Sequence, residues 1–121
     1  MHIAFYGDGK KTFALTHPWV LELEKTTGHG IGALFKRLAQ REYAYHDVLE
    51  TVRLALIGGG TSPEAASNLI ATYGVHRPIA ETATIAIKVL SIVMLGPEEP
   101  PVEKSDDLAA AIDDALGQVP A

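Results

Sequence analysis

The chain has no cysteine among its 121 residues. This absence excludes a disulfide framework, a thiolate nucleophile and a thiolate metal site. The opening residues, MHIAFY, also lack the basic lead and the long apolar run of a signal peptide. We therefore expect a cytoplasmic protein.

A surplus of positive charge is missing as well. The formal net charge is −5. Residues 1–96 carry nine Lys and Arg against eight Asp and Glu, whereas residues 97–121 carry seven acidic residues against Lys104 alone. Because a nucleic-acid backbone attracts proteins with a strong basic surplus, this distribution disfavours nucleic acid as the main partner. It predicts a near-neutral body followed by an acidic tail.

Long uninterrupted apolar runs are also scarce. A membrane span needs about 20 predominantly apolar residues. The most apolar segment, residues 78–96, is interrupted by Glu81 and Lys88. Its β-branched residues are compatible with a strand, but its length favours a buried helix. We expect a central core helix there and no membrane association.

What is present suits one soluble domain, with 47% hydrophobic and 21% charged residues. The segments 2–6 and 11–15 are rich in strand formers, and Gly7-Asp8-Gly9 between them predicts a β-hairpin. Helical patterns follow, with their ends marked by proline and glycine. The expected helices run from Pro18 to Gly28, from about Ile31 to Gln40, from about Tyr45 to Ile57, from the Thr61 cap to Gly74, and from Pro78 to Gly96.

Two short motifs set the expected helix boundaries in the middle of the chain. Thr61-Ser62-Pro63-Glu64 has the form of a capping box, in which Thr61 caps the helix and Glu64 reaches back. Gly58-Gly59-Gly60 just before it stops the preceding helix and permits a sharp reversal.

These patterns predict a mainly helical α+β fold, in which an N-terminal β-hairpin packs on a bundle of about five helices. Residues 1–96 are expected to form a single globular domain. Residues 97–104 form a Pro- and Glu-rich linker, and residues 105–121 form an acidic tail with a short amphipathic helix. The apolar stripe of that helix consists of Leu108, Ile112 and Leu116.

No motif in the sequence indicates a catalytic, nucleotide-binding or metal-binding site. Gly28-His29-Gly30-Ile31-Gly32-Ala33 has the form of a dinucleotide fingerprint, but a charged helical segment precedes it where a strand is required. The five histidines have no metal-ligand spacing, and no serine lies in a nucleophile elbow. We therefore predict no catalytic residue, no cofactor, no metal ion and no enzymatic activity.

The order of the segments resembles one protein family, over roughly residues 3–99. The similarity is carried by KTFAL at 11–15, LELEKTTG at 21–28, IGALFKRL at 31–38, DVLETVRLALIGGG at 47–60, SPEAA at 62–66 and GPEE at 96–99. In this order they resemble the small tail assembly proteins of gene transfer agents and related prophages, which are known both as tail assembly chaperones and as tail tube proteins.

This resemblance implies a non-enzymatic role in virion assembly through protein–protein interaction. In the chaperone version, the protein coats the hydrophobic tape-measure protein until tail tube proteins replace it. The contacts expected for that partner are apolar residues of the first, second and last helices of the body: Trp19, Leu23, Leu34, Phe35 and Met94. In the tube version, the hairpin joins neighbouring copies in a ring, so a homo-oligomer is also compatible with the sequence.

A regulatory or DNA-adaptor module is a further alternative. The two helices joined by Gly58-Gly59-Gly60 have the order of a helix-turn-helix. Against it, the segment Pro63 to Tyr73, which would read the DNA, contains no Lys or Arg. An enzyme is the class that the sequence favours least.

Overall fold

The computed structural model describes residues 1–96; the predicted linker (97–104) and acidic tail (105–121) lie outside the described residues. A hairpin of β1 (His2–Tyr6) and β2 (Gly9–Phe13) precedes a helical body. The body consists of α1 (His17–Thr27), α2 (Ile31–Ala39), α3 (Tyr45–Gly58), α4 (Pro63–Leu69), the π-helical turn η1 (Ile70–Gly74) and α5 (Ile79–Leu95). The predicted α+β, mainly helical fold with its hairpin and five helices is confirmed.

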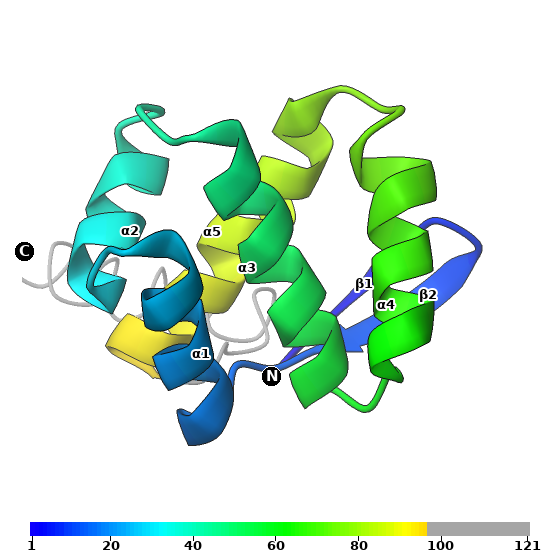
Figure 1. Cartoon of the computed structure of the whole chain (residues 1–121), viewed down its shortest axis with the longest axis horizontal. Coiled ribbons are helices and arrows are strands. Elements are labelled where there is room, and N and C mark those ends of the chain that lie inside the picture. Colours follow the sequence, from blue (N-terminus) through cyan, green and yellow to red (C-terminus); the bar gives the residue numbers. More distant parts are fainter. Residues whose placement is uncertain (97–121) are drawn as a thin grey trace, which may run out of the picture.

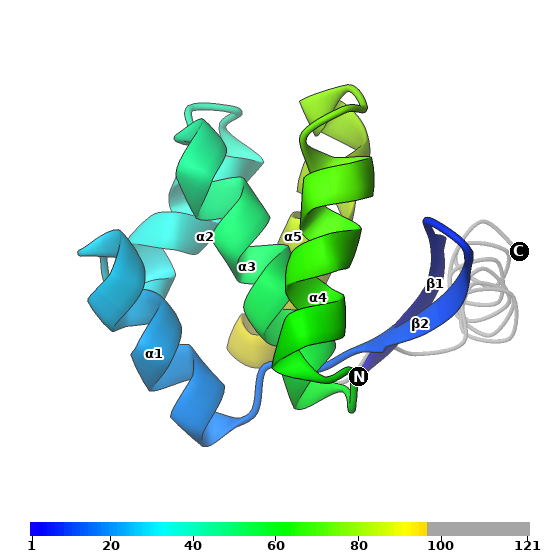
Figure 2. The same cartoon turned by 45° about the vertical axis from the view of Figure 1, so that its right-hand side comes forward.

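The hairpin lies at one side of the helical body. In Figures 1 and 2 the strands run beside α4, and α1 and α2 lie on the opposite side of α3. The two strands are antiparallel and pair from His2 with Phe13 to Tyr6 with Gly9. The loop therefore has two residues, one fewer than the sequence suggested, and Gly7 at its first position has a φ of +72°. Two-residue hairpin turns whose twist matches that of the strands require a positive φ at this position, and glycine adopts a positive φ readily.

Helix α3 lies at the centre of the fold, between α1, α4, α5 and β2. Its apolar side chains meet Phe13 from the hairpin and the inner face of α5. Edge-to-face contacts of Tyr6 with Phe13 and Tyr73 join the hairpin to the same core. The fully buried apolar side chains include Phe13, Leu23, Val48, Val52, Leu54, Leu56, Val89 and Leu90.

The glycines at the end of α3 let two backbones touch. A Cβ on Gly58 would collide with the carbonyl oxygen of Ala14, and one on Gly59 would collide with that of Thr12. The close approach allows the Ala14 amide to donate a hydrogen bond of 2.9 Å to the Ala55 carbonyl. The run GGG thus does more than end a helix, because its first two residues attach the hairpin to α3.

The start of α4 differs from the prediction by one residue. Ser62, not Thr61, is the N-cap, and its hydroxyl accepts a hydrogen bond of 3.2 Å from the Ala65 amide. The backbone amide of Thr61 donates a hydrogen bond of 2.9 Å to the Leu56 carbonyl, which closes the end of α3. Pro63 then occupies the first helical position, as the sequence indicated.

The apolar segment after Pro78 is a helix, as predicted. Helix α5 spans 17 residues and buries its inward face, which includes Ala86, Val89 and Leu90. No helix in residues 1–96 combines the length and the hydropathy that a membrane span requires.

Candidate partner-binding surface

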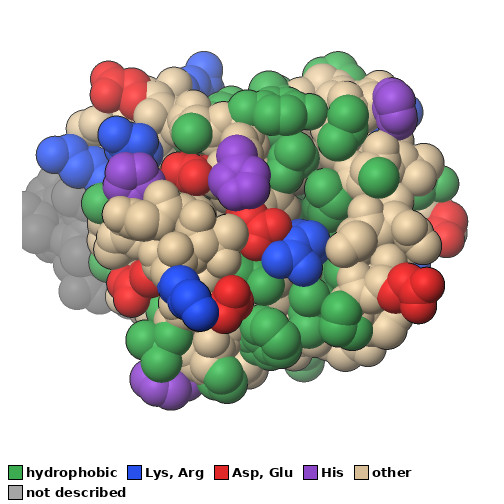
Figure 3. Space-filling view, in the orientation of Figure 1, with side chains coloured by type: hydrophobic (Ala, Val, Ile, Leu, Met, Phe, Trp, Pro, Cys, Tyr) green, Lys and Arg blue, Asp and Glu red, His purple; other side chains and the backbone are tan. Residues whose placement is uncertain are grey.

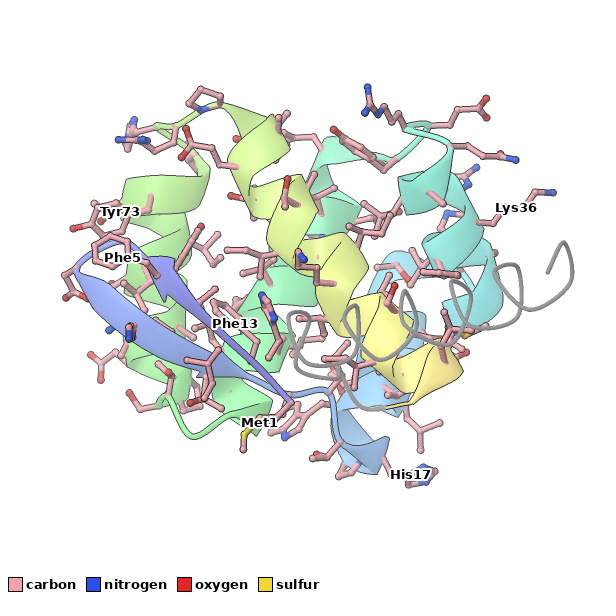
Figure 4. The ribbon with its side chains drawn as sticks, turned by 180° about the vertical axis from the view of Figure 1, so that it is seen from behind. Met1, Phe5, Phe13, His17, Lys36 and Tyr73 are labelled. Carbon is pink, nitrogen blue, oxygen red and sulfur yellow. The ribbon has the colours of Figure 1, made fainter. Side chains whose placement is uncertain are left out.

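A groove of about 610 Å³ lies between the start of α1, the connection from β2 to α1, and the C-terminal part of α5. We call it the α1–α5 groove. Figure 4, which shows the molecule from behind, places Met1 at the base of the hairpin and His17 at the start of α1. The groove is lined by Met1, Phe13, Ala14, Leu15, Thr16, His17, Val20, Val89, Ile92 and Val93.

The lining of the α1–α5 groove is mostly aliphatic. Leu15, Val20, Ile92 and Val93 are half-buried, so part of each side chain faces the opening. Among residues 1–96, no carboxylate lines the groove, and the polar side chains in its lining are those of Thr16 and His17. Such a surface suits an apolar side chain or an amphipathic helix better than a charged substrate.

Exposed apolar side chains continue from the groove along the last turn of α5. Leu95 is 78% exposed, Met94 is 42% exposed and Met1 is 68% exposed. The Met94 methyl group reaches over the first turn of α2, where a Cβ on Gly32 would lie 4.0 Å from it. Large apolar residues that cluster on a surface mark sites of protein interaction more often than isolated ones do.

The five predicted contact residues divide into three groups. Leu23 and Leu34 are 0% and 2% exposed and belong to the core, so neither can meet a partner in this conformation. Trp19 and Phe35 are half-buried against that core. Met94 lies at the surface, next in the chain to the groove residue Val93, and its methyl group reaches toward α2.

Sequence reasoning missed Val20, Ile92, Val93 and Leu95 as surface residues. Segment 79–95 is apolar nearly all round, so helical periodicity could not show which side is left open. One pattern in the sequence could have indicated exposure at the end of this segment. Met94 and Leu95 directly precede Gly96, after which the sequence changes to proline and glutamate.

A second apolar patch lies on the outward face of β1. Ile3 and Phe5 are 59% and 70% exposed. Phe5 also borders a smaller hollow of about 260 Å³ between the hairpin tip, Tyr73 and the start of α5. Figure 4 shows Phe5 and Tyr73 together at that tip. Within residues 1–96, β1 pairs only with β2, so the sheet of the described residues has two strands.

Buried polar groups in the described domain are paired and support the fold. Tyr6 and Thr82 share a hydrogen bond of 3.3 Å, and burial raises the pKa of the Tyr6 hydroxyl above 10.0. Arg53 donates two hydrogen bonds, of 2.7 and 2.8 Å, to the Glu50 carboxylate. That pairing raises the pKa of the Arg53 guanidinium.

The glycine-rich segment 28–33 is a joint between two helices. Gly28 ends α1 with a φ of 75°, and α1 stands where a dinucleotide fingerprint requires a strand. The Glu24 carboxylate accepts a hydrogen bond of 2.8 Å from the Ile31 amide at the start of α2. An anion of the protein itself thus occupies the position that a phosphate would take.

Charge is evenly spread on the face shown in Figure 3, where acidic, basic and histidine side chains are interspersed. Among residues 1–96, no three His, Cys, Asp or Glu side chains come together as a set of metal ligands. The distinguishing surface of the described domain is therefore its apolar groove, with the exposed end of α5.

Comparison with known proteins places this domain in a family. A sequence profile of the family described as "Phage tail tube protein, GTA-gp10" matches residues 1–96. No curated protein and no solved structure gives a significant match. The profile covers well over half of the 121 residues and includes every element of the described fold. The chain therefore belongs to the GTA-gp10 family of gene transfer agent and phage tail proteins.

Proposed function

We propose that this protein is a non-enzymatic chaperone of tail assembly, which binds apolar helical segments of the tape-measure protein in the α1–α5 groove. The observation that carries the proposal is the groove of about 610 Å³ and its aliphatic lining. Family membership supports a role in a phage-like tail.

The physical properties of the surface suit this task. An amphipathic helix binds by laying its apolar face into such a groove, and each Å² of apolar surface removed from water contributes about 25 cal/mol. Met1 and Met94 add flexible side chains that adapt to different apolar partners.

The test is co-expression with the tape-measure protein of the same particle, followed by purification of the complex and measurement of soluble tape measure. The wild-type chain is expected to co-purify with the tape measure and to raise its soluble fraction. The double variant Met94→Ser/Leu95→Ser should lose both effects and keep its fold, because both side chains are exposed.

Val75→Ser provides a matched control. Val75 is 49% exposed and precedes α5, at the opposite end of that helix from the groove. This variant should solubilise the tape measure as well as the wild type does. Loss of binding in both variants, or in neither, would contradict a site at the end of α5.

A structural component of the tail tube is the second candidate function. It is favoured by the exposed side chains of Ile3 and Phe5 on β1, which would give a neighbouring copy an apolar surface at the hairpin. In that case the purified protein should polymerise or be present in finished particles. Phe5→Ser should then abolish assembly, whereas Met94→Ser/Leu95→Ser should not.

A further inference from the structure

We propose that the C-terminal segment 105–116 of the same chain lies in the α1–α5 groove whenever no partner occupies it. This inference goes beyond the proposed function and does not depend on which protein the groove receives. It rests on the position of the groove, on where the described chain ends, and on the residue pattern and charge of the segment that follows.

The described chain ends at the edge of the groove. Ile92 and Val93 line the groove, and Gly96 follows Leu95 directly. Residues 97–104 are rich in proline, and eight such residues span about 25 Å when extended. That length equals the length of α5, whose 17 residues rise about 1.5 Å each. Segment 105–116 is therefore long enough and close enough to enter the groove.

The residue pattern of this segment fits an apolar groove. Leu108, Ile112 and Leu116 recur every four residues, which predicts one apolar stripe about 12 Å long on a helix. Ser105, Asp106 and Asp107 favour a helix start just before the stripe. Such a short helix is marginal in water alone, so burial of its stripe supplies the stabilisation it needs.

Charge favours the same arrangement. Residues 97–121 carry seven acidic residues and one lysine, whereas the body is close to neutral. On the body, Lys88 is exposed on α5 one turn before the groove residue Ile92. Among residues 1–96, Lys88 has no ion-pair partner. Tethering through a short linker gives the segment a local concentration in the millimolar range, so a weak contact is sufficient.

The absence of cysteine from the chain allows a clean cross-linking test. The full-length double variant Val93→Cys/Ile112→Cys should form a disulfide within one chain under mild oxidation. The matched control is Leu21→Cys/Ile112→Cys, since Leu21 is 52% exposed and adjoins the groove residue Val20 but is not part of the lining. The disulfide at Val93 should form about tenfold faster than the one at Leu21.

Equal rates in the two double variants would overturn the proposal, because they would reflect chance collision alone. Disulfides between chains would also overturn it and would indicate that a second copy occupies the groove. The full-length variant Leu108→Ser/Ile112→Ser/Leu116→Ser gives an independent readout. It should shift the methyl NMR signals of Val20 and Ile92 and leave that of Val75 unchanged; unchanged signals at the groove would contradict the docking.

The cross-linked protein separates this inference from the proposed function. If both are correct, the disulfide-locked form should lose tape-measure binding and regain it on reduction. A disulfide that forms rapidly in a protein that never binds the tape measure would leave the docking intact and remove the chaperone proposal. If the wild type binds the tape measure but the Val93 disulfide forms no faster than the Leu21 disulfide, the chaperone proposal stands and the docking of the C-terminal segment is wrong.

Discussion

Helices α3 and α5 are both rich in apolar residues, yet they end in opposite environments. The last turns of α3 are closed in by β2, and Leu54, Ala55 and Leu56 are at most 1% exposed. The last turn of α5 has no comparable cover within residues 1–96, and Leu95 is 78% exposed. Apolar composition alone therefore does not decide whether a helix end is core or surface.

The difference comes from what the neighbouring residues permit. Gly58 and Gly59 have no side chains, so the backbone of Ala14, just after β2, and of Thr12 in β2 comes into direct contact with the end of α3. Among residues 1–96, the end of α5 lies near the start of α1, Met1 and the first turn of α2, and the α1–α5 groove is open there. The first arrangement stabilises the domain, and the second leaves a surface on which another helix can be buried.

The largest expected effect is at the closed end. Gly58→Ala places a methyl group against the Ala14 carbonyl oxygen, which belongs to the backbone and cannot rotate away. We expect a loss of about 3 kcal/mol or more in the free energy of unfolding, measured by urea denaturation and circular dichroism. Gly9→Ala is the control, because a Cβ there meets nothing within 4 Å. Similar stability of both variants would show that the close contact is not rigid.

The next largest effect is expected from a substitution at a buried position of α5, compared with one at an exposed position of the same helix. Leu90 is fully buried, and Leu95 lies five residues later at the surface. Leu90→Ala should lower the free energy of unfolding by about 2–5 kcal/mol through lost burial and a cavity. Leu95→Ala should change it by less than about 0.5 kcal/mol. Thermal unfolding of both full-length variants measures the contrast, and a large loss for Leu95→Ala would mean that another part of the chain covers this position.

The smallest effect concerns two ion pairs in different environments. Glu50 is 9% exposed and pairs with Arg53 through two hydrogen bonds, whereas Glu81 pairs with Arg77 with both side chains at least half exposed. Glu50→Gln should cost about 1–2 kcal/mol, because the nearly buried carboxylate that accepts both hydrogen bonds from Arg53 is replaced by a neutral amide. Glu81→Gln should cost less than about 0.5 kcal/mol. Denaturant titration of each variant tests this order, and equal losses would contradict it.

Local signals in the sequence predicted much of the fold. Pro18 and Gly28 marked the ends of α1, and the spacing of Val48, Val52 and Leu56 marked the buried face of α3. Local signals were one residue off where the end of α3 and the start of α4 adjoin. Thr61 has the chemistry of an N-cap, but its backbone belongs to the turn that closes α3, and the hydroxyl that caps α4 is that of Ser62.

The candidate site was less accessible to prediction from the sequence. Five apolar residues were expected to meet a partner, and two of them, Leu23 and Leu34, are core residues. A helical pattern shows that a residue faces inward, but it does not show how completely its neighbours cover it. Because α5 is apolar on nearly every side, its pattern left the open face undefined.

The sequence by itself determined the fold class, the positions of the helices and the separation of an acidic tail from a near-neutral body, because these depend on local propensity, periodicity and charge. Only the tertiary structure decided that Gly58 and Gly59 attach the hairpin to α3 and that the end of α5 borders an apolar groove. Both features depend on contacts between segments far apart in the chain. Those contacts follow from how the elements pack, which no local pattern records.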